Sequence, residues 1–297
     1  MAPRFFGTMP QFTRRSDNFI TRAIRFAAPE ANNRISSCTT VLTGQLNARH
    51  ILSPATTIHI ERWSRWQSRK AGAAVLTQWG PQQCSQELLE KPALADVPAM
   101  QRRRLSPLAR VTFQVLAHCS ESSAEEPVVF SSVMGELQRT QSLLESIARH
   151  EPLSPTAFSL SVHNAIAGLW SQINNNRAPM LALAPCADSP VPALLEAAGI
   201  LCEGEYTAVN VVYARENYPQ FYQPWLDSPP GPCALALRLV ASPPAEDCAI
   251  RVSLRRVERS QPAVASGNDS ALGRLLDHEA NAVNVSEPRC DWLLERN

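Results

Sequence analysis

The side chains most able to do chemistry in this chain lie between Ser154 and Ala187. They are the imidazole of His163 beside the amide of Asn164, and the thiol of Cys186. An imidazole can act as a general acid or base, and a thiol close to a helix N-terminus can form a thiolate that accepts an acyl group. A structural role for each is also open, and it is favoured. Asn164 would cap the next helix, His163 would bond to a loop carbonyl, and Cys186 would be a structural residue.

The spacing of the other reactive residues argues against a serine hydrolase, a His–Cys dyad, and a cofactor or metal site. The serine pairs at 131–132 and 159/161 lack the G-x-S-x-G pattern of a hydrolase nucleophile. His118 and Cys119 are adjacent on an expected helix, where neighbouring side chains point about 100° apart, so they are a poor dyad. The sequence contains no phosphate loop, dinucleotide fingerprint or metal-spaced cluster, so we predict no cofactor and no metal.

Three elements position the candidate residues. A helix opened by Asn164 carries one apolar stripe of Ile166, Leu169, Trp170 and Ile173, and small residues including Gly168 on its other faces, which would allow close packing. A turn at Arg177-Ala178-Pro179 leads to a fully apolar strand at 180–184, which we expect to be buried. A helix capped by Asp188 or Ser189 then follows.

The remaining chain alternates strands and helices, which favours a layered α/β domain. Helix 136–149 is expected to turn Leu137, Leu144, Ile147 and Ala148 inward, and residues 72–98 read as a loop with one short helix. The other expected elements are strands at 57–60, running into a loop with Trp63 and Trp66, and at 127–133, 206–214, 233–240, 249–257 (an edge) and 291–294, with helices at 108–118, 191–201 and 270–280.

Composition narrows the class of protein. A net charge of +1 gives no electrostatic reason to expect a nucleic acid partner, and no apolar run approaches the about 20 residues of a membrane span. Eight cysteines without a CxxC pattern are typical of reduced thiols, so we predict a cytoplasmic protein. Residues 1–52 are expected to be a poorly ordered or mis-annotated extension. Residues 53–297 would form the domain, with a core at 56–240 and a C-terminal appendage at 241–297.

The ordered series Gly135-Glu136, Ser154-Pro155, His163-Asn164, Gly168 and Arg177-x-Pro179 resembles the N-terminal half of the β-ketoacyl synthases, in the thiolase-like superfamily. In particular it resembles the stand-alone, chain-length-factor-like proteins of aryl polyene and type II polyketide clusters. The resemblance implies a thiolase-like α/β fold, N-terminal half only, layered α/β/α with a mixed sheet. It makes His163, Asn164, Gly168, Arg177 and Pro179 signature residues.

Counted from the turn, the nucleophile of that family falls on Ala187, and Cys186 is one position early. Because a one-residue shift turns a strand side chain to the opposite face, the resemblance favours a chain without the nucleophile. The histidine pair that the family supplies from its second half is also missing. Only His278 follows Ala187, and about 57 residues follow Val240.

The resemblance therefore implies a non-catalytic partner subunit that forms a heterodimer with a full-length β-ketoacyl synthase, strand 180–186 pairing edge to edge with its counterpart. The alternative is an acyltransferase or condensing enzyme that uses Cys186 as its nucleophile. Arg102–Arg104 is either a solvated turn or a contact for an acidic acyl carrier protein.

Overall fold

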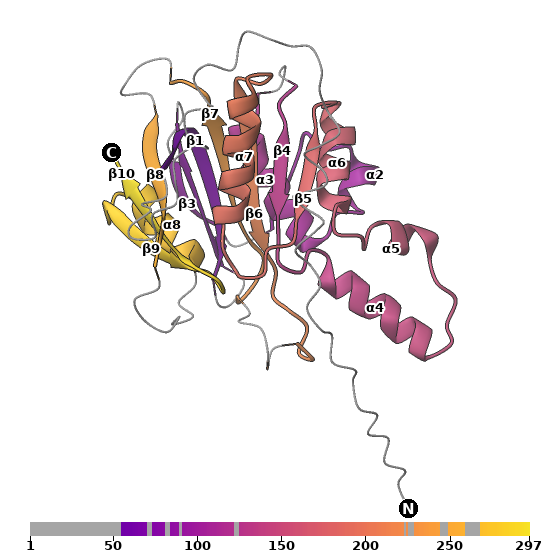
Figure 1. Cartoon of the computed structure of the whole chain (residues 1–297). Coiled ribbons are helices and arrows are strands. Elements are labelled where there is room, and N and C mark those ends of the chain that lie inside the picture. Colours follow the sequence, from indigo (N-terminus) through magenta and orange to yellow (C-terminus); the bar gives the residue numbers. More distant parts are fainter. Residues whose placement is uncertain are drawn as a thin grey trace, which may run out of the picture. The chain divides into compact units, whose positions relative to one another are not determined.

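A computed structural model of the chain describes residues 55–69, 73–80, 84–88, 91–121, 125–222, 224, 229–243, 249–258 and 268–297. The extension expected at 1–52 lies outside the described residues. The fold below belongs to the unit Leu52–Asn297. Its elements carry the labels of Figure 1.

One mixed sheet organises this unit, with strand order β5-β4-β6-β7-β1-β8-β10-β9 and with β2 and β3 added beside β1. β5, β4 and β6 are parallel to one another, and the other pairs are antiparallel. The strands are β1 (Thr56–Ser68), β2 (Ala74–Trp79), β3 (Cys84–Leu88), β4 (Val128–Ser131), β5 (Met180–Leu183), β6 (Ala208–Arg215), β7 (Cys233–Val240), β8 (Ile250–Val257), β9 (Ala282–Ser286) and β10 (Asp291–Arg296).

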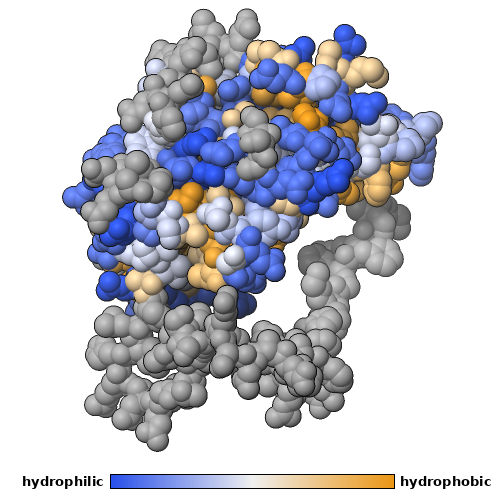
Figure 2. Space-filling model, turned by 90° about the horizontal axis from the view of Figure 1, so that it is seen from above, coloured by the Kyte–Doolittle hydropathy of each residue, from blue (hydrophilic) through white to orange (hydrophobic). Residues whose placement is uncertain are grey.

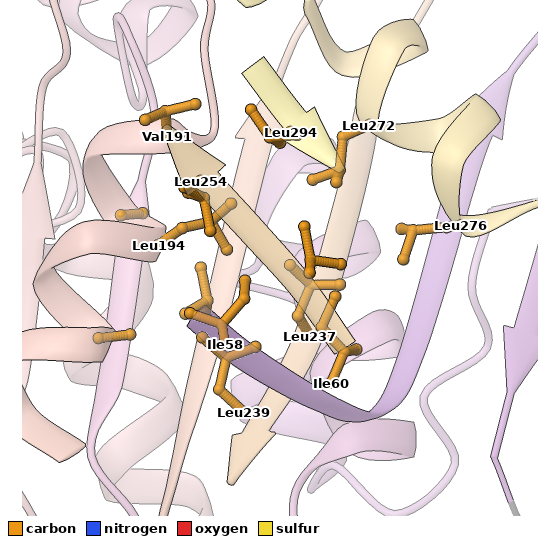
Figure 3. Close-up of a cluster of buried hydrophobic side chains, with 14 of the residues drawn as sticks. Ile58, Ile60, Val191, Leu194, Leu237, Leu239, Leu254, Leu272, Leu276 and Leu294 are labelled. Atoms are coloured by element: carbon orange, nitrogen blue, oxygen red, sulfur yellow. The ribbon is translucent and has the colours of Figure 1, made fainter. Parts of the chain in front are cut away.

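Helices cover both faces of the sheet, which confirms the expected layered α/β class (Figure 1). α7 and α8 share one apolar cluster with the central strands, and α3 and α6 share the cluster on the other face. Figure 3 shows the first cluster, with Leu194 and Leu272 facing Leu237 and Leu254 of the sheet. The helices are α2 (Ala99–Arg102), α3 (Pro107–Cys119), α4 (Leu137–Ala148), α5 (Pro155–Ser159), α6 (Ala165–Asn174), α7 (Val191–Glu203) and α8 (Asn268–Leu276).

Local sequence explains how α3 forms and where it packs. Ser106 caps the helix by accepting a hydrogen bond from the Ala109 N–H at 3.0 Å, and Pro107 occupies the first turn. Phe113 is fully buried and meets Trp170 of α6 edge to face, with ring centroids 5.1 Å apart. The two helices therefore form one layer over the sheet.

A buried ionic network ties the centre of the sheet together. Arg238 of β7 is 8% exposed and pairs with Glu126 at 2.6 Å and with Glu61 of β1. Asn210 of β6 donates to the second oxygen of Glu126 at 2.7 Å. Hydrogen bonds from neighbouring strands thus compensate the buried charges of Arg238 and Glu126. The same bonds help to fix the register of these strands.

The structure corrects several expected elements. Residues 74–79 and 84–88 are the antiparallel pair β2–β3 rather than loop, and Trp63 and Trp66 lie inside β1 rather than in a loop after it. Residues 250–257 are not an edge strand, because β8 lies between β1 and β10. β9 was not expected. Residues 250–257 and 282–296, set apart from the core in the sequence analysis, continue the same sheet.

The outward face of α7 is polar. Glu196, Gly199 and Glu203 are exposed, whereas Val191, Ala193 and Leu194 are fully buried against the sheet. An amphipathic helix of this kind needs burial on one side only. α7 is therefore stable in a three-layer arrangement without a further layer against its outer surface.

Candidate functional site

The candidate site lies in the loop between β5 and α7, at the carboxyl ends of the parallel strands. Ala187, at the expected nucleophile position, is half-buried in a bend, and its carbonyl accepts a hydrogen bond from the Ser189 N–H at 2.8 Å. α7 begins four residues later, at Val191. Because the side chain of Ala187 is a methyl group, it can neither attack a carbonyl nor carry an acyl group.

The N-terminus of α7 is occupied by the chain's own polar groups. Ser189 is fully buried, accepts a hydrogen bond from the Val191 N–H at 3.2 Å, and donates to Glu287 Oε1 at 2.7 Å. Asp188 forms an ion pair with Arg215 at 2.6 Å. The positive end of the helix dipole, which could stabilise a thiolate or an oxyanion, is therefore met by a hydroxyl and nearby carboxylates.

Cys186 lies in a bend beyond the end of β5 at Leu183, where its thiol is free and exposed. Its sulfur has no hydrogen-bond partner among the described residues, so no imidazole in that part of the chain is placed to activate it. This arrangement lacks the base that a cysteine nucleophile normally uses. The exposure of Cys186 keeps the alternative, an acyl-accepting thiol, open to direct test.

His163 and Asn164 lie at the start of α6 and act on the backbone. His163 Nε2 is 2.7 Å from the carbonyl oxygen of Ser132, just after β4, and its ring packs against Phe130. Gly135 has φ +52°, and a Cβ there would meet the His163 ring at 3.0 Å. Asn164 occupies the N-cap position, but its side chain makes no capping hydrogen bond. No hydrogen bond between described residues links His163 or Asn164 to the loop at Ala187.

The other signature residues have unequal structural roles. The Pro179 carbonyl accepts from the Val128 N–H at 3.0 Å and so begins the β4–β5 ladder, whereas Arg177 is exposed. The turn is held instead by Asn176, which donates to the Glu126 carbonyl at 2.8 Å and accepts from the Ala178 N–H at 2.9 Å. Gly168 is exposed, and a Cβ there would meet nothing within 4 Å. The close packing expected at Gly168 is therefore not made by the residues that the structure describes.

β5 is an edge strand, and the expectation that it is buried is wrong: all four residues are half-buried. On the β4 side, Val128 donates to the Pro179 carbonyl and Ser132 donates to the Leu183 carbonyl at 3.1 Å. In a parallel ladder, alternate residues face alternate sides, so the N–H and C=O groups of Met180 and Ala182 face the open edge. Among the described strands only β4 pairs with β5.

Next to this edge, the segment 137–162 forms what we call the arm, consisting of α4, α5 and the loops around them (Figure 1). Only its first residue, Leu137, is buried. The expectation that Leu144, Ile147 and Ala148 face inward is wrong, because α4 leaves the sheet after its first turn. The large apolar side chains exposed on the arm are Leu144 (53%), Ile147 (53%), Leu153 (44%), Phe158 (62%) and Val162 (41%).

This exposure contrasts with the face seen from above, where hydrophilic residues cover most of the described surface and hydrophobic ones show as smaller patches (Figure 2). An isolated two-turn or three-turn helix is marginal in water, so helices in proteins normally gain stability by packing an apolar face. The apolar face of α4 has no such packing within the described part of the chain. It is a surface that a second protein could cover.

Buried carboxyl groups anchor the root of the arm. Glu136 accepts hydrogen bonds from Ser106 Oγ at 2.5 Å and from Arg139 at 2.8 Å, and Glu216 accepts from the Gln138 N–H at 3.2 Å. Burial raises the pKa of Glu136, and burial raises the pKa of Glu216 to about 7. Glu216 accepts a first-turn N–H of α4 and so stabilises the start of that helix, whereas the Glu136 carboxyl is bonded to side chains and makes no capping hydrogen bond.

No group of acidic, histidine or cysteine side chains that could hold a metal occurs in the described ranges. In the same residues, every helix is too short or too polar to cross a membrane.

Arg102 binds the Leu94 carbonyl at 3.0 Å, whereas Arg103 and Arg104 are exposed. A contact between these two arginines and an acyl carrier protein stays a prediction.

Ser189, Glu287 and Asn176 are the site residues whose roles depend on contacts between distant elements. Of these, only Ser189 carried a sequence signal, as a helix cap.

Comparison with known proteins identifies the relatives of this architecture. The profile of the family described as β-ketoacyl synthase, N-terminal domain, matches residues 76–294. A comparison with curated proteins finds no match. The matched range reaches beyond Val240, so it includes β8, β9 and most of β10, which the sequence analysis had set outside the core.

The chain was also compared with solved structures. The chain resembles a chain of the ketosynthase ApeO in complex with its chain length factor ApeC from Xenorhabdus doucetiae, with a TM-score of 0.62 and 22% identity over 81% of this chain and 99% of that chain. It also matches the ishigamide ketosynthase/chain length factor (TM-score 0.49, 14% identity, 75% and 73% of the two chains) and a β-ketoacyl synthase from Burkholderia phymatum STM815 (0.46, 13%, 77% and 71%). The first similarity confirms the expected thiolase-like layered fold.

Proposed function

Because the chain belongs to the β-ketoacyl synthase N-terminal domain family, we propose that it is a non-catalytic partner subunit, of the chain-length-factor type, of a complete β-ketoacyl synthase. The observation that carries the proposal is the open edge of β5 beside the uncovered apolar arm. Both features are unusual for a protein that works alone, because open strand edges and apolar patches promote association.

The loop after β5 supports the non-catalytic part of the proposal. Ala187 has no nucleophilic atom, and Ser189 and Glu287 fill the start of α7. Condensation also needs imidazole groups, and His163 is committed to the Ser132 carbonyl. The partner would therefore supply the nucleophile and its histidines.

The docking geometry follows from the same two features. The N–H and C=O groups of Met180 and Ala182 would pair with the corresponding strand of the synthase, which would extend the sheet across the heterodimer. The arm and the first turns of α6 would then cover the partner and help to bound its acyl channel. The structure of ApeO in complex with its chain length factor is a precedent for a pair of this kind. The pathway would be aryl polyene or polyketide assembly.

The test is co-purification with the β-ketoacyl synthase encoded nearest to this chain. The informative variant is Ala182→Pro, because it removes an N–H that faces the open edge and leaves the bonds to β4 in place. The matched control is Asn284→Pro on β9. β9 is the edge strand at the other end of the sheet. Asn281 and Arg296 form a hydrogen-bonded pair, and in an antiparallel ladder such pairs alternate with non-bonded ones. Asn284, opposite Leu293, is therefore in a non-bonded pair, and its N–H faces the open edge.

We expect the native chain and Asn284→Pro to co-purify with the synthase, and Ala182→Pro to remain folded and lose the partner. A folded native chain that ignores the synthase would refute the proposal. Equal binding by the two proline variants would refute the β5 interface and leave the partner role to be located on another surface.

A further inference from the structure

A cavity of about 650 Å³ opens on the α3 side of the sheet, away from the loop at Ala187. Its walls come from the end of β1, the start of β2, the loop before α2, the first turns of α3 and α4, and the segment before β7. None of the residues that line it belongs to β5, α5, α6 or α7. Its volume falls within the about 300–1,000 Å³ that small-molecule sites occupy.

The inner wall of the cavity is apolar and firmly packed. Trp66, Leu105 and Val111 line it and are 3%, 6% and 1% exposed, so they belong to the core. Ser68 donates to the Pro232 carbonyl at 2.6 Å, and a Cβ at Gly231 would meet Ser68 at 2.8 Å. The two strand ends are therefore held in close contact, and the wall between them is preformed.

The rim of the cavity is cationic. Arg69, Lys91, Arg103 and Arg110 line it, and no acidic residue does so within the described ranges. None of the four forms an ion pair with a described carboxylate. Arg110 is instead held by the carbonyls of Arg102 and Pro92. In a chain whose net charge is +1, this is a local excess of positive charge.

Among the described residues, the two nearby acids are bonded elsewhere. Glu136 is paired with Arg139, and Glu216 accepts the Gln138 N–H. Neither carboxyl group is among the residues that line the cavity. Arginine side chains bind phosphate and carboxylate oxygens with two parallel hydrogen bonds, and several cations together favour an anion with more than one negative charge.

We propose that this cavity binds an organic phosphate that carries an apolar chain. The apolar segment would lie against Trp66, Leu105 and Val111, and the phosphate would be bound at the rim by Arg69, Arg103 and Lys91. The site shares no residue with the surface proposed for the synthase partner, so it does not depend on that role.

The experiment is isothermal titration of the full chain with octyl phosphate, with inorganic phosphate and octyl glucoside as probes of each half of the ligand. We expect saturable binding of one octyl phosphate, and binding weaker by about tenfold or more for inorganic phosphate and for octyl glucoside. Equal binding of octyl glucoside would overturn the proposal, because it would show that the phosphate is not recognised. Absence of saturable octyl phosphate binding would overturn it as well.

Two variants and one control locate the site. Arg69→Gln with Arg103→Gln should weaken octyl phosphate binding about tenfold or more, and Ala73→Phe should block the cavity without touching a charge. The control, Arg149→Gln with Arg255→Gln, removes two exposed guanidinium groups elsewhere and should leave binding unchanged. An equal loss in the control would overturn the proposal by showing non-specific attraction. Unchanged binding in Ala73→Phe would overturn the assignment to this cavity.

Discussion

Leu144 and Ile147 offer the sharpest quantitative test of the arm. They lie three residues apart on one face of α4, and each is 53% exposed. Replacing both with glutamine keeps good helix formers at these positions and removes the apolar surface. About half of each side chain is buried in the free chain, and glutamine retains only the Cβ and Cγ carbons of each, so the free energy of unfolding should fall by no more than about 1 kcal/mol.

The effect on the complex should be larger. Complete burial of a leucine or isoleucine is worth about 1.5–3 kcal/mol, so the half that is still exposed is worth about 1 kcal/mol for each residue. If the synthase covers both, the double variant should lose about 2 kcal/mol of binding free energy, which is about a 30-fold rise in Kd. Titration calorimetry of the two subunits measures this directly. Met100→Gln, which removes an equally large side chain that is 71% exposed on α2, is the control and should bind normally.

Two results would refute this reasoning. An unchanged Kd for the double variant would show that the synthase leaves the arm in solvent. A loss of more than about 1 kcal/mol in the unfolding free energy of the free subunit would show that Leu144 and Ile147 are already packed.

Three further predictions concern the subunit alone. Glu216→Gln should weaken the fall in stability with rising pH. The folded-state pKa of about 7 lies above the usual 4.5, so the native state holds a proton that the unfolded state releases, and stability falls as pH rises between these values, by up to about 3 kcal/mol. Urea unfolding at pH 5 and pH 8 checks this prediction. An equally large difference in unfolding free energy between the two pH values in the variant would contradict it. Trp170→Ala should cost about 3–5 kcal/mol in the same assay, because Trp170 packs against buried Phe113; a cost below about 1 kcal/mol would show that α6 is not docked on α3. Cys186 should react with iodoacetamide because it is exposed, whereas incubation with an acyl-CoA should leave the intact mass unchanged; stoichiometric acylation that is lost in Cys186→Ala would establish the acyltransferase alternative.

The sequence predicted best where local pattern and burial agree. Cys233–Val240 is β7 at the expected bounds, and the predicted stripe of Ile166, Leu169, Trp170 and Ile173 is the face of α6 that packs against the core. β6 and α3 were also recognised, because fully apolar strands and capped amphipathic helices carry strong local signals. The strands β2 and β3 were missed, since the pairing of β2 with β1 and of β3 with β2 has no local signature in these short runs of mixed polarity.

The errors on α4 and β5 have a different physical cause. The spacing of Leu144 and Ile147 correctly indicates an apolar helix face, but periodicity does not say whether that face meets the same chain or another one. The run Met180–Leu183 likewise indicates burial, and the structure leaves it at an edge. At the candidate site, Ala187 could be assigned by counting, whereas the bond between Ser189 and Glu287 joins residues far apart in sequence and has no local signature.

The place of β1 in the sheet has a consequence for synthesis. His59 pairs with Val240 on one side and with Arg251 on the other, so both lateral partners of the first half of β1 are translated near the end of the chain, whereas its second half also pairs with β2, which follows directly. At about 5–20 residues per second, the ribosome takes about ten to forty seconds to reach them. During that interval Ile58 and Ile60 are unshielded on the nascent polypeptide. The first half of β1 can therefore complete its hydrogen-bonded ladders only late in synthesis.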